Sequence, residues 1–205
     1  MSEKATREQI IEAADRLFYR RGYEHTSFAD VAEAVGISRG NFYHHFKAKD
    51  EILAAVIELR LGKTRGMLEQ WTKDGKDPVE RIRSFIHILF RNQGLIERYG
   101  CPVGTLCTEL AKLGHSARDD AAQLFALFRD WLREQFEQLG RGADADALAM
   151  HVLARSQGVA TLANAFRDDG FLAREVRVMD EWLEENAGRR GKQSRGTPAR
   201  RREAR

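Results

Sequence analysis

The sequence predicts an all-α fold. Apolar residues recur at spacings of three and four along most of the 205 residues, the period of a helix that buries one face. No segment alternates apolar and polar residues convincingly, as a half-buried strand would, and only 3 prolines interrupt the chain. We therefore expect packed helices without a sheet.

Three short helices are expected near the N-terminus. The first carries an apolar face from Ile10 to Phe18 and ends at Gly22. The second begins after Thr26 or Ser27, either of which can cap it, and breaks at Gly36. The third begins after Ser38 and buries Phe42 and Phe46, which lie one turn apart. A helix, a glycine-containing turn and a short helix form the helix-turn-helix signature.

Longer helical segments are expected in the rest of the chain. They run from Asp50 toward Trp71, from Pro78 through Phe90, from Pro102 onward, from Ala117 to Leu139, from Asp144 to Arg167, and from near Phe171 to Leu183. We divide the chain into a helix-turn-helix domain (residues 1–48), a helical body (49–187) and a basic tail without apolar period (188–205), which we expect to be disordered.

Charge is concentrated in two places. The tail contains eight basic residues and one acidic residue, a net charge of +7 within a chain of net charge +3, so the remainder is mildly acidic. Between Glu33 and Asp50 there is no acidic residue, while Arg39, Lys47 and Lys49 are present. This window suits a surface that meets phosphates.

The composition excludes several classes of protein. No apolar run approaches the roughly 18 residues that a membrane helix needs, and the first residues are charged where a signal peptide would be apolar. Two cysteines are too few for a disulfide scaffold and lack zinc-site spacing. We expect a soluble cytoplasmic protein that has no membrane partner, cofactor or metal site.

The third helix has a thin polar outer face. Successive residues are 100° apart, which places Gly40 and His44 opposite the two phenylalanines, flanked by Asn41 and Tyr43. Asn41 can donate and accept at a base edge, and Tyr43, Lys47 and Lys49 suit phosphate contacts. On the helical wheel Arg39 lies further from the centre of the outer face, so a base contact by Arg39 is less well supported. The alternative is a solvated helix in a small three-helix domain.

Residues 26–53, TSFADVAEAVGISRGNFYHHFKAKDEIL, strongly resemble the DNA-binding signature of TetR/AcrR-type transcriptional regulators. The resemblance implies that the first three helices bind an operator, that the body binds a small molecule and dimerises, and that ligand binding releases the DNA. The expected DNA-binding residues are Thr26, Ser27, Ser38, Arg39, Gly40, Asn41, Tyr43, His44, Lys47 and Lys49. The operator sequence does not carry over, because the family varies at Asn41.

The body contains no catalytic arrangement that stands on its own. His87, His115 and His151 are widely separated and have no nucleophile motif nearby, so we interpret them as core or surface histidines. The resemblance implies a ligand pocket among the body helices. Candidates for its lining are Phe85, Leu89, Cys101, Cys107, Phe125, Phe128 and Trp131, whose helical spacing is equally typical of core.

Cys101 is a candidate chemical sensor. Pro102 is favoured at the first position of a helix, so Cys101 would be its N-cap, where free N–H groups and Arg98 can stabilise a thiolate. The segment resembles a glycine-cysteine junction in a branch of the family that includes electrophile-responsive repressors. The alternative, which we favour, is that Cys101 and Cys107 are small buried apolar residues.

The last two helices are candidates for a dimer interface. Val159, Ala163, Phe166, Met179 and Trp182 lie on apolar faces with small residues that permit close helix crossing. Packing within one chain could use the same faces, but the resemblance favours a two-fold four-helix interface. A dimer would also let two recognition helices read spaced half-sites.

The combined interpretation is a ligand-responsive transcriptional regulator, a repressor rather than an enzyme, that binds a palindromic operator as a homodimer and is released by a small-molecule or electrophile inducer. The alternatives are a cytoplasmic thiol enzyme that uses Cys101 and a non-specific DNA-packaging protein driven by the tail. The acidic body and the helix-turn-helix pattern argue against both.

Overall fold

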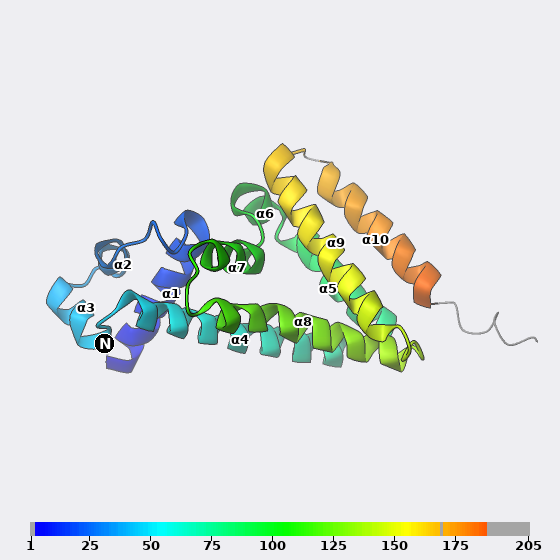
Figure 1. The fold of residues 1–205 in the computed structure, drawn as a ribbon, viewed down its shortest axis with the longest axis horizontal. Coiled ribbons are helices and arrows are strands. Elements are labelled where there is room, and N and C mark those ends of the chain that lie inside the picture. The colour runs from blue at the N-terminus through cyan, green and yellow to red at the C-terminus, as the bar shows by residue number, and fades with distance from the viewer. Residues whose placement is uncertain (1–2, 169, 188–205) are drawn as a thin grey trace, which may run out of the picture.

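The computed structural model describes residues 3–168 and 170–187, and all regular secondary structure in these ranges is helical (Figure 1). The helices are α1 (Glu3–Arg21), α2 (Phe28–Val35), α3 (Arg39–His45), α4 (Lys49–Asp74), α5 (Pro78–Arg91), α6 (Gln93–Tyr99), α7 (Pro102–Lys112), α8 (Arg118–Gln138), α9 (Ala145–Phe166) and α10 (Phe171–Ala187). The all-α prediction is confirmed. The predicted disorder of the tail lies outside the described residues.

Local hydrogen bonds explain where α2 and α3 begin and end. The Ser27 side chain accepts the Asp30 N–H at 3.2 Å, and the Asp30 carboxylate accepts the Ser27 N–H at 2.7 Å, which forms a capping box. Gly36 ends α2 in the left-handed region at φ 74°, and the Ser38 hydroxyl caps α3 by accepting the Asn41 N–H at 3.3 Å. The predicted cap at Ser38 and break at Gly36 are confirmed.

The N-terminal helices share a core with the body. Phe42 and Phe46 are 0% and 1% exposed and pack with residues of α1, α2 and the first half of α4. Leu106 of α7 and Leu124 of α8 belong to the same cluster. The body therefore supports α1–α3 directly.

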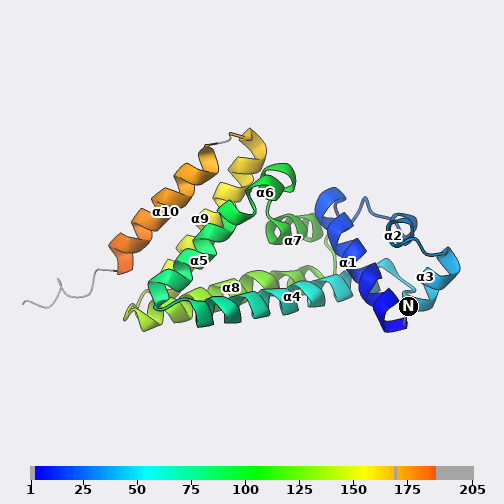
Figure 2. The same cartoon turned by 180° about the vertical axis from the view of Figure 1, so that it is seen from behind.

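The body is built around two long helices, α4 and α8, that run side by side (Figure 1). The view from behind shows α5 packed with α9 and α10 at the end away from α1–α3 (Figure 2). A second core joins these helices and includes the ring pair Trp71 and Trp131, whose centroids are 5.8 Å apart. Within the described ranges no helix is long and apolar enough to cross a membrane.

The sequence did not predict α6. Only Ile96 is buried among its seven residues, so it shows no apolar period. Asn92 ends α5 and starts α6, because its N–H bonds to Ile88 and its carbonyl accepts from Leu95 and Ile96. Gly100, at φ 79°, ends the helix and turns the chain into α7.

Candidate DNA-binding face and ligand cavity

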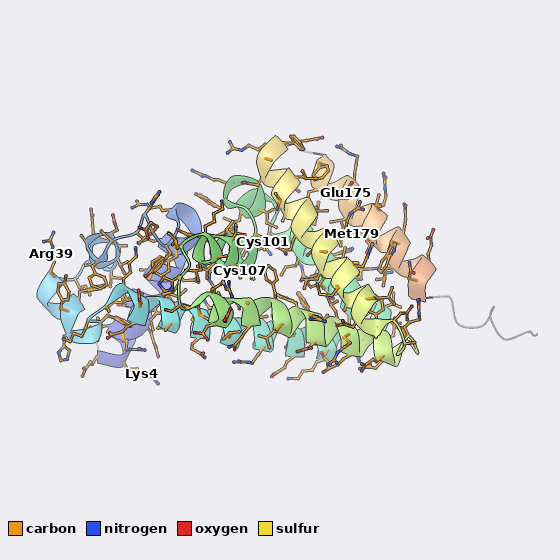
Figure 3. The ribbon with its side chains drawn as sticks, viewed as in Figure 1. Lys4, Arg39, Cys101, Cys107, Glu175 and Met179 are labelled. Carbon is orange, nitrogen blue, oxygen red and sulfur yellow. The ribbon has the colours of Figure 1, made fainter. Side chains whose placement is uncertain are left out.

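The outer face of α3 lies at one end of the molecule. Tyr43 is 46% exposed, and its ring packs edge-on against Phe28 at 5.5 Å. Nothing lies within 4 Å of a Cβ built on Gly40, and Arg39 projects from the same end (Figure 3). Eight of the predicted DNA-binding residues are exposed: Ser27, Ser38, Arg39, Gly40, Asn41, Tyr43, His44 and Lys47.

Thr26 and Lys49 do not belong to this exposed face. Thr26 is 1% exposed, and its hydroxyl donates to the Gly22 carbonyl at 2.7 Å. The Lys49 ammonium donates to the Glu24 carbonyl at 3.1 Å and lies 4.2 Å from the centre of the Tyr23 ring. We therefore correct the prediction for Thr26, whose side chain stabilises the α1–α2 turn, while Lys49 is held against the protein.

The acid-free window of the sequence receives carboxylates from neighbouring helices. His44 Nε2 lies 3.0 Å from Glu3 Oε1 of α1, and Glu51 accepts the Lys47 N–H at 2.9 Å. The ammonium of Lys47 donates to the Tyr43 carbonyl. The contact to Glu3 also brings the start of α1, with exposed Lys4, to the edge of α3 (Figure 3). Lys4 is not among the DNA-binding residues predicted from the sequence, although a basic residue in the first turn of α1 lies next to α3.

A cavity of about 210 Å³ lies between the body helices and α1. Its lining includes five of the seven predicted ligand-binding residues, namely Phe85, Leu89, Cys101, Phe125 and Phe128. The other two lie elsewhere. The Cys107 thiol donates to the Ala121 carbonyl at 3.4 Å, and the Trp131 indole donates to the Thr72 hydroxyl at 2.9 Å. We correct these two assignments, because both side chains are used for packing outside the cavity.

Cys101 is the N-cap of α7, as predicted, with Pro102 in the first turn. Its Sγ accepts the Gly104 N–H at 3.5 Å, and both thiols are free. Burial raises the pKa of Cys107 to about 11, so this thiol is protonated at neutral pH. The Arg98 guanidinium lies 5.2 Å from the Tyr99 ring centre.

Hydrogen bonds from α1 and α4 tie the cavity wall to the N-terminal helices. The Tyr19 hydroxyl donates a shared bond to the carbonyls of Leu95 (3.1 Å) and Gly100 (2.8 Å). Burial, with a further contribution from Cys101, raises the Tyr19 pKa to about 12. Arg60 of α4 donates to Asp15 Oδ1 at 2.6 Å and to the Pro102 carbonyl at 2.7 Å.

A second link joins the far end of α7 to the turn after α1. The Glu109 carboxylate accepts the N–H groups of Tyr23 and Glu24, each at 2.9 Å. The Tyr23 hydroxyl donates to Asp50 at 2.6 Å, and this bond lowers the Asp50 pKa. One end of α7 is therefore bonded to α4, and the other end is bonded to the turn between α1 and α2.

The predicted interface residues on α9 and α10 divide into two groups. Val159, Ala163 and Met179 are 2%, 1% and 4% exposed and pack inside the protomer, so we correct their assignment to an interface. Phe166 is 71% exposed, and Trp182 is partly exposed. Other exposed apolar residues on these helices are Met150, Leu162 and Val178.

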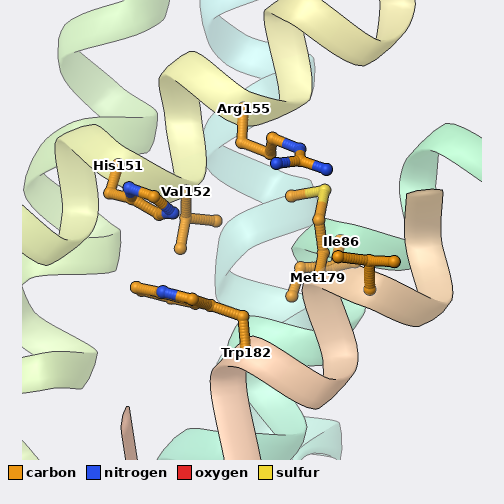
Figure 4. Close-up of a pocket in the computed structure, with 7 residues that line it drawn as sticks. Ile86, His151, Val152, Arg155, Met179 and Trp182 are labelled. Carbon is orange, nitrogen blue, oxygen red and sulfur yellow. The ribbon is translucent and has the colours of Figure 1, made fainter. Parts of the chain in front are cut away.

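A small cavity of about 130 Å³ lies between α5, α9 and α10. The His151 ring stacks on the Trp182 ring at 4.4 Å, with Arg155 and Met179 at the other side (Figure 4). Stacking keeps both aromatic rings at the α9–α10 surface.

The histidines of the body serve contacts between helices. His87 pairs with Asp180 at 2.7 Å and joins α5 to α10, and His115 lies 3.5 Å from Asp50. Among the described residues no histidine is hydrogen-bonded to either thiol, and none of the His, Cys, Asp and Glu side chains there form a group that could hold a metal.

Two family models match this chain. A model of bacterial regulatory proteins of the tetR family matches residues 10–56, which contain α2, α3 and most of α1. A model of the C-terminal domain of LmrA/YxaF-like transcriptional regulators matches residues 78–177. Together they cover most of the helical chain.

Known proteins are similar over both regions. The HTH-type transcriptional regulator LmrA of Bacillus subtilis is 27% identical over 84% of this chain and 87% of its own length. The HTH-type transcriptional regulator TtgR of Pseudomonas putida is 40% identical over 87 residues, which span 41% of its length.

A solved structure has the same fold. A TetR transcriptional regulator from Legionella pneumophila superposes with a TM-score of 0.75 and 25% identity, over 85% of this chain and 95% of its own. Both family models, the relatives and the shared fold agree with the helix-turn-helix geometry of α2 and α3. The chain belongs to the TetR family of DNA-binding transcriptional regulators.

Proposed function

We propose that the protein is a repressor that binds a palindromic operator as a homodimer and is released by a small molecule. The observation that carries the proposal is the exposed face of α3, where Asn41 and Tyr43 stand outward on a helix anchored by buried Phe42. In a helix-turn-helix protein such a helix enters the major groove. Asn41 is assigned to a base edge, and Tyr43 and Lys47 to phosphates.

The proposed dimer uses the surface of α9 and α10. Phe166, Leu162, Met150 and Val178 are exposed apolar side chains on these two helices, and Trp182 lines the small cavity together with Val178. Their burial against a second copy would stabilise the dimer through the hydrophobic effect. Two copies of α3 would then read two half-sites related by two-fold symmetry.

The proposed release follows from the position of α7. One end of α7 lines the cavity through Cys101 and Val103, and Glu109 near its other end holds the turn after α1. A ligand that displaces α7 would shift α1 and the attached α3. The spacing between the two recognition helices would then no longer match the half-sites. A regulator that acts in this way works in the cytoplasm, where the chromosome lies.

An electrophile is the second candidate for the inducer, because the Cys101 thiol lines the cavity at the start of α7. The Cys101 thiol loses its proton to water, and the thiolate attacks an alkylating agent such as iodoacetamide, which forms a thioether and releases iodide. The added bulk would lie against α7. Release of operator from the parent protein but not from Cys101→Ser would support this candidate, whereas equal release from both would leave a reversible ligand.

The test of the DNA-binding assignment is a set of anisotropy titrations of a selected duplex, of its single-base-pair variants and of an unrelated duplex with four variants of the protein. Tyr43→Phe and Lys47→Ala are expected to weaken binding to all duplexes, because they remove phosphate contacts. Asn41→Ala is expected to cost about 1 to 3 kcal/mol at one base pair of each half-site. Lys73→Ala, which removes a charge at the far end of α4, is the matched control. Parent-like binding by all three α3-face variants would show that this face does not contact DNA.

A further inference from the structure

In the part of the chain that the structure describes, no charged side chain lines the cavity beside α7. Its wall consists of apolar side chains with a few neutral polar groups, and no Asp, Glu, Lys, Arg or His lines it. Arg60, which donates to the carbonyl of the lining residue Pro102, is paired with Asp15. An ion moved from water into such a cavity would lose its hydration without gaining a counter-charge. The lining therefore favours an uncharged ligand.

Most polar groups of the lining already have partners. The Tyr19 hydroxyl donates to the carbonyls of α6 and Gly100, as described above. The Ser156 hydroxyl donates to the Leu153 carbonyl at 2.7 Å and accepts from the Gln157 amide at 3.4 Å. These groups support the wall and have little capacity left for a ligand.

Thr64 is different. It lines the cavity from α4 and is 8% exposed, yet its hydroxyl makes no hydrogen bond within the described residues. Several other threonines in the described helices bond to the carbonyl four residues earlier, as Thr72 does to Leu68 at 2.8 Å and Thr161 does to Gln157 at 2.9 Å. The Thr64 hydroxyl is therefore a polar group of the lining that remains available to a ligand.

The volume limits the size of the ligand. A dry apolar cavity of about 150 Å³ in another protein accommodates benzene. The cavity here is about 210 Å³, with Phe85 and Phe128 in edge-to-face contact at 5.4 Å on its wall. Asn92 and 47% exposed Leu95 lie where the lining reaches the surface at the α5–α6 corner. A single ring with a small substituent matches this space.

We propose that the cavity binds an uncharged, single-ring-sized apolar molecule that carries one hydroxyl or carbonyl oxygen, and that Thr64 donates to that oxygen. This assignment rests on the proposed function, in which the cavity receives the inducer. Its new content is the ligand class and the specificity-determining role of Thr64.

Three probes of nearly the same shape test the proposal by isothermal titration calorimetry on the full chain without DNA. Acetophenone is neutral and has a carbonyl, cumene lacks the oxygen, and benzoate replaces the methyl group of acetophenone with a charged oxygen. Acetophenone is expected to bind at least about tenfold more tightly than benzoate, because the cavity offers no counter-charge. Benzoate binding as tight as acetophenone, or no binding of acetophenone, overturns the proposal.

Variants at Thr64 test the specificity. Thr64→Val keeps the shape and removes the hydroxyl, and is expected to weaken acetophenone binding roughly twofold to tenfold while cumene binding is unchanged. Thr64→Ser is expected to restore acetophenone binding, and exposed Thr108→Val is the matched control. Cumene binding also reports that each variant is folded. Unchanged binding of both acetophenone and cumene in Thr64→Val would overturn the role of Thr64.

Operator release is measured separately with the same probes. If acetophenone binds as expected but does not release the DNA, the ligand class stands and the proposed release mechanism fails. If benzoate alone binds and releases the DNA, regulation by ligand stands and the ligand class is overturned.

Discussion

At the scale of single residues, one hydroxyl joins the N-terminal helices to the cavity wall. Tyr19 reaches from α1 to the carbonyls of Leu95 and Gly100, and its burial raises the pKa to about 12. The folded protein therefore holds a neutral phenol at pH values where an unfolded tyrosine, with a pKa of about 10, already ionises.

Tyr19→Phe is expected to lower the free energy of unfolding by about 1 kcal/mol at pH 8, because the two carbonyls lose their donor. The contribution of Tyr19 is complete below about pH 10 and is lost as the pH rises toward about 12. The difference between parent and variant should therefore shrink from pH 8 to pH 11 in urea titrations. A difference that grows with pH would contradict the assigned environment of Tyr19.

Two glycines give opposite predictions. Gly22 has φ 89°, and a Cβ there would lie 2.8 Å from Glu109 Oε1, so Gly22→Ala is expected to destabilise the fold by about 1 to 3 kcal/mol. Gly62 lies inside α4 with nothing within 4 Å of its Cβ position, and Gly62→Ala is expected to stabilise by about 0.5 to 1 kcal/mol. Urea titrations of both variants check the signs, and a stabilising Gly22→Ala would refute the described turn.

At the scale of elements, α7 is the connection between cavity and DNA-binding helices. Glu109 accepts two backbone N–H groups of the turn that follows α1, which have no partner within a helix. The sequence offers no sign of this contact, because the two segments are 86 residues apart.

Glu109→Ala is expected to speed hydrogen exchange at the Tyr23 and Glu24 amides by at least about tenfold, since both lose a charged acceptor. Exposed Glu134→Ala on α8 is the control. Exchange is followed residue by residue by NMR. Unchanged rates at both amides would mean that Glu109 does not hold the α1–α2 turn.

The positions of the helices could be predicted from the sequence. Which partner packs against each apolar helix face could not. Ser38 and Gly36 act through adjacent backbone, so their positions in the sequence determine the α2–α3 turn. Val159 and Ala163 show a buried face, but helical period is the same whether the neighbour belongs to the same chain or to a second copy. The short α6 has one buried residue and no period to detect.

In the candidate site too, local features could be predicted from the sequence and contacts between distant helices could not. The outward residues of α3 were predicted because Phe42 and Phe46 fix the rotation of a single helix. Phe128 and Trp131 share one face of α8, but the first lines the cavity and the second packs on Trp71. Helical spacing gives the direction of a side chain and does not say which cavity lies along that direction.

At the scale of the whole molecule, charge is divided between the tail and the remainder. Residues 188–205 carry a net charge of +7. Their deletion is expected to flatten the dependence of DNA affinity on salt concentration, because fewer counterions are released on binding. The preferred duplex should stay the same. Anisotropy titrations over a range of salt concentrations check this, and a changed preferred sequence would show that the tail reads bases.

The proposed function requires that two copies of α3 read a symmetric operator. Selection of bound duplexes from a random library by the full protein tests it most directly. We expect a two-fold symmetric consensus whose half-sites are spaced by about one helical turn, about 10 to 10.5 base pairs, or a multiple of it. The same selection with Asn41→Ala should change the same base in both half-sites. A library without enrichment, or a single asymmetric site that Asn41→Ala leaves unchanged, would show that α3 does not read a symmetric operator.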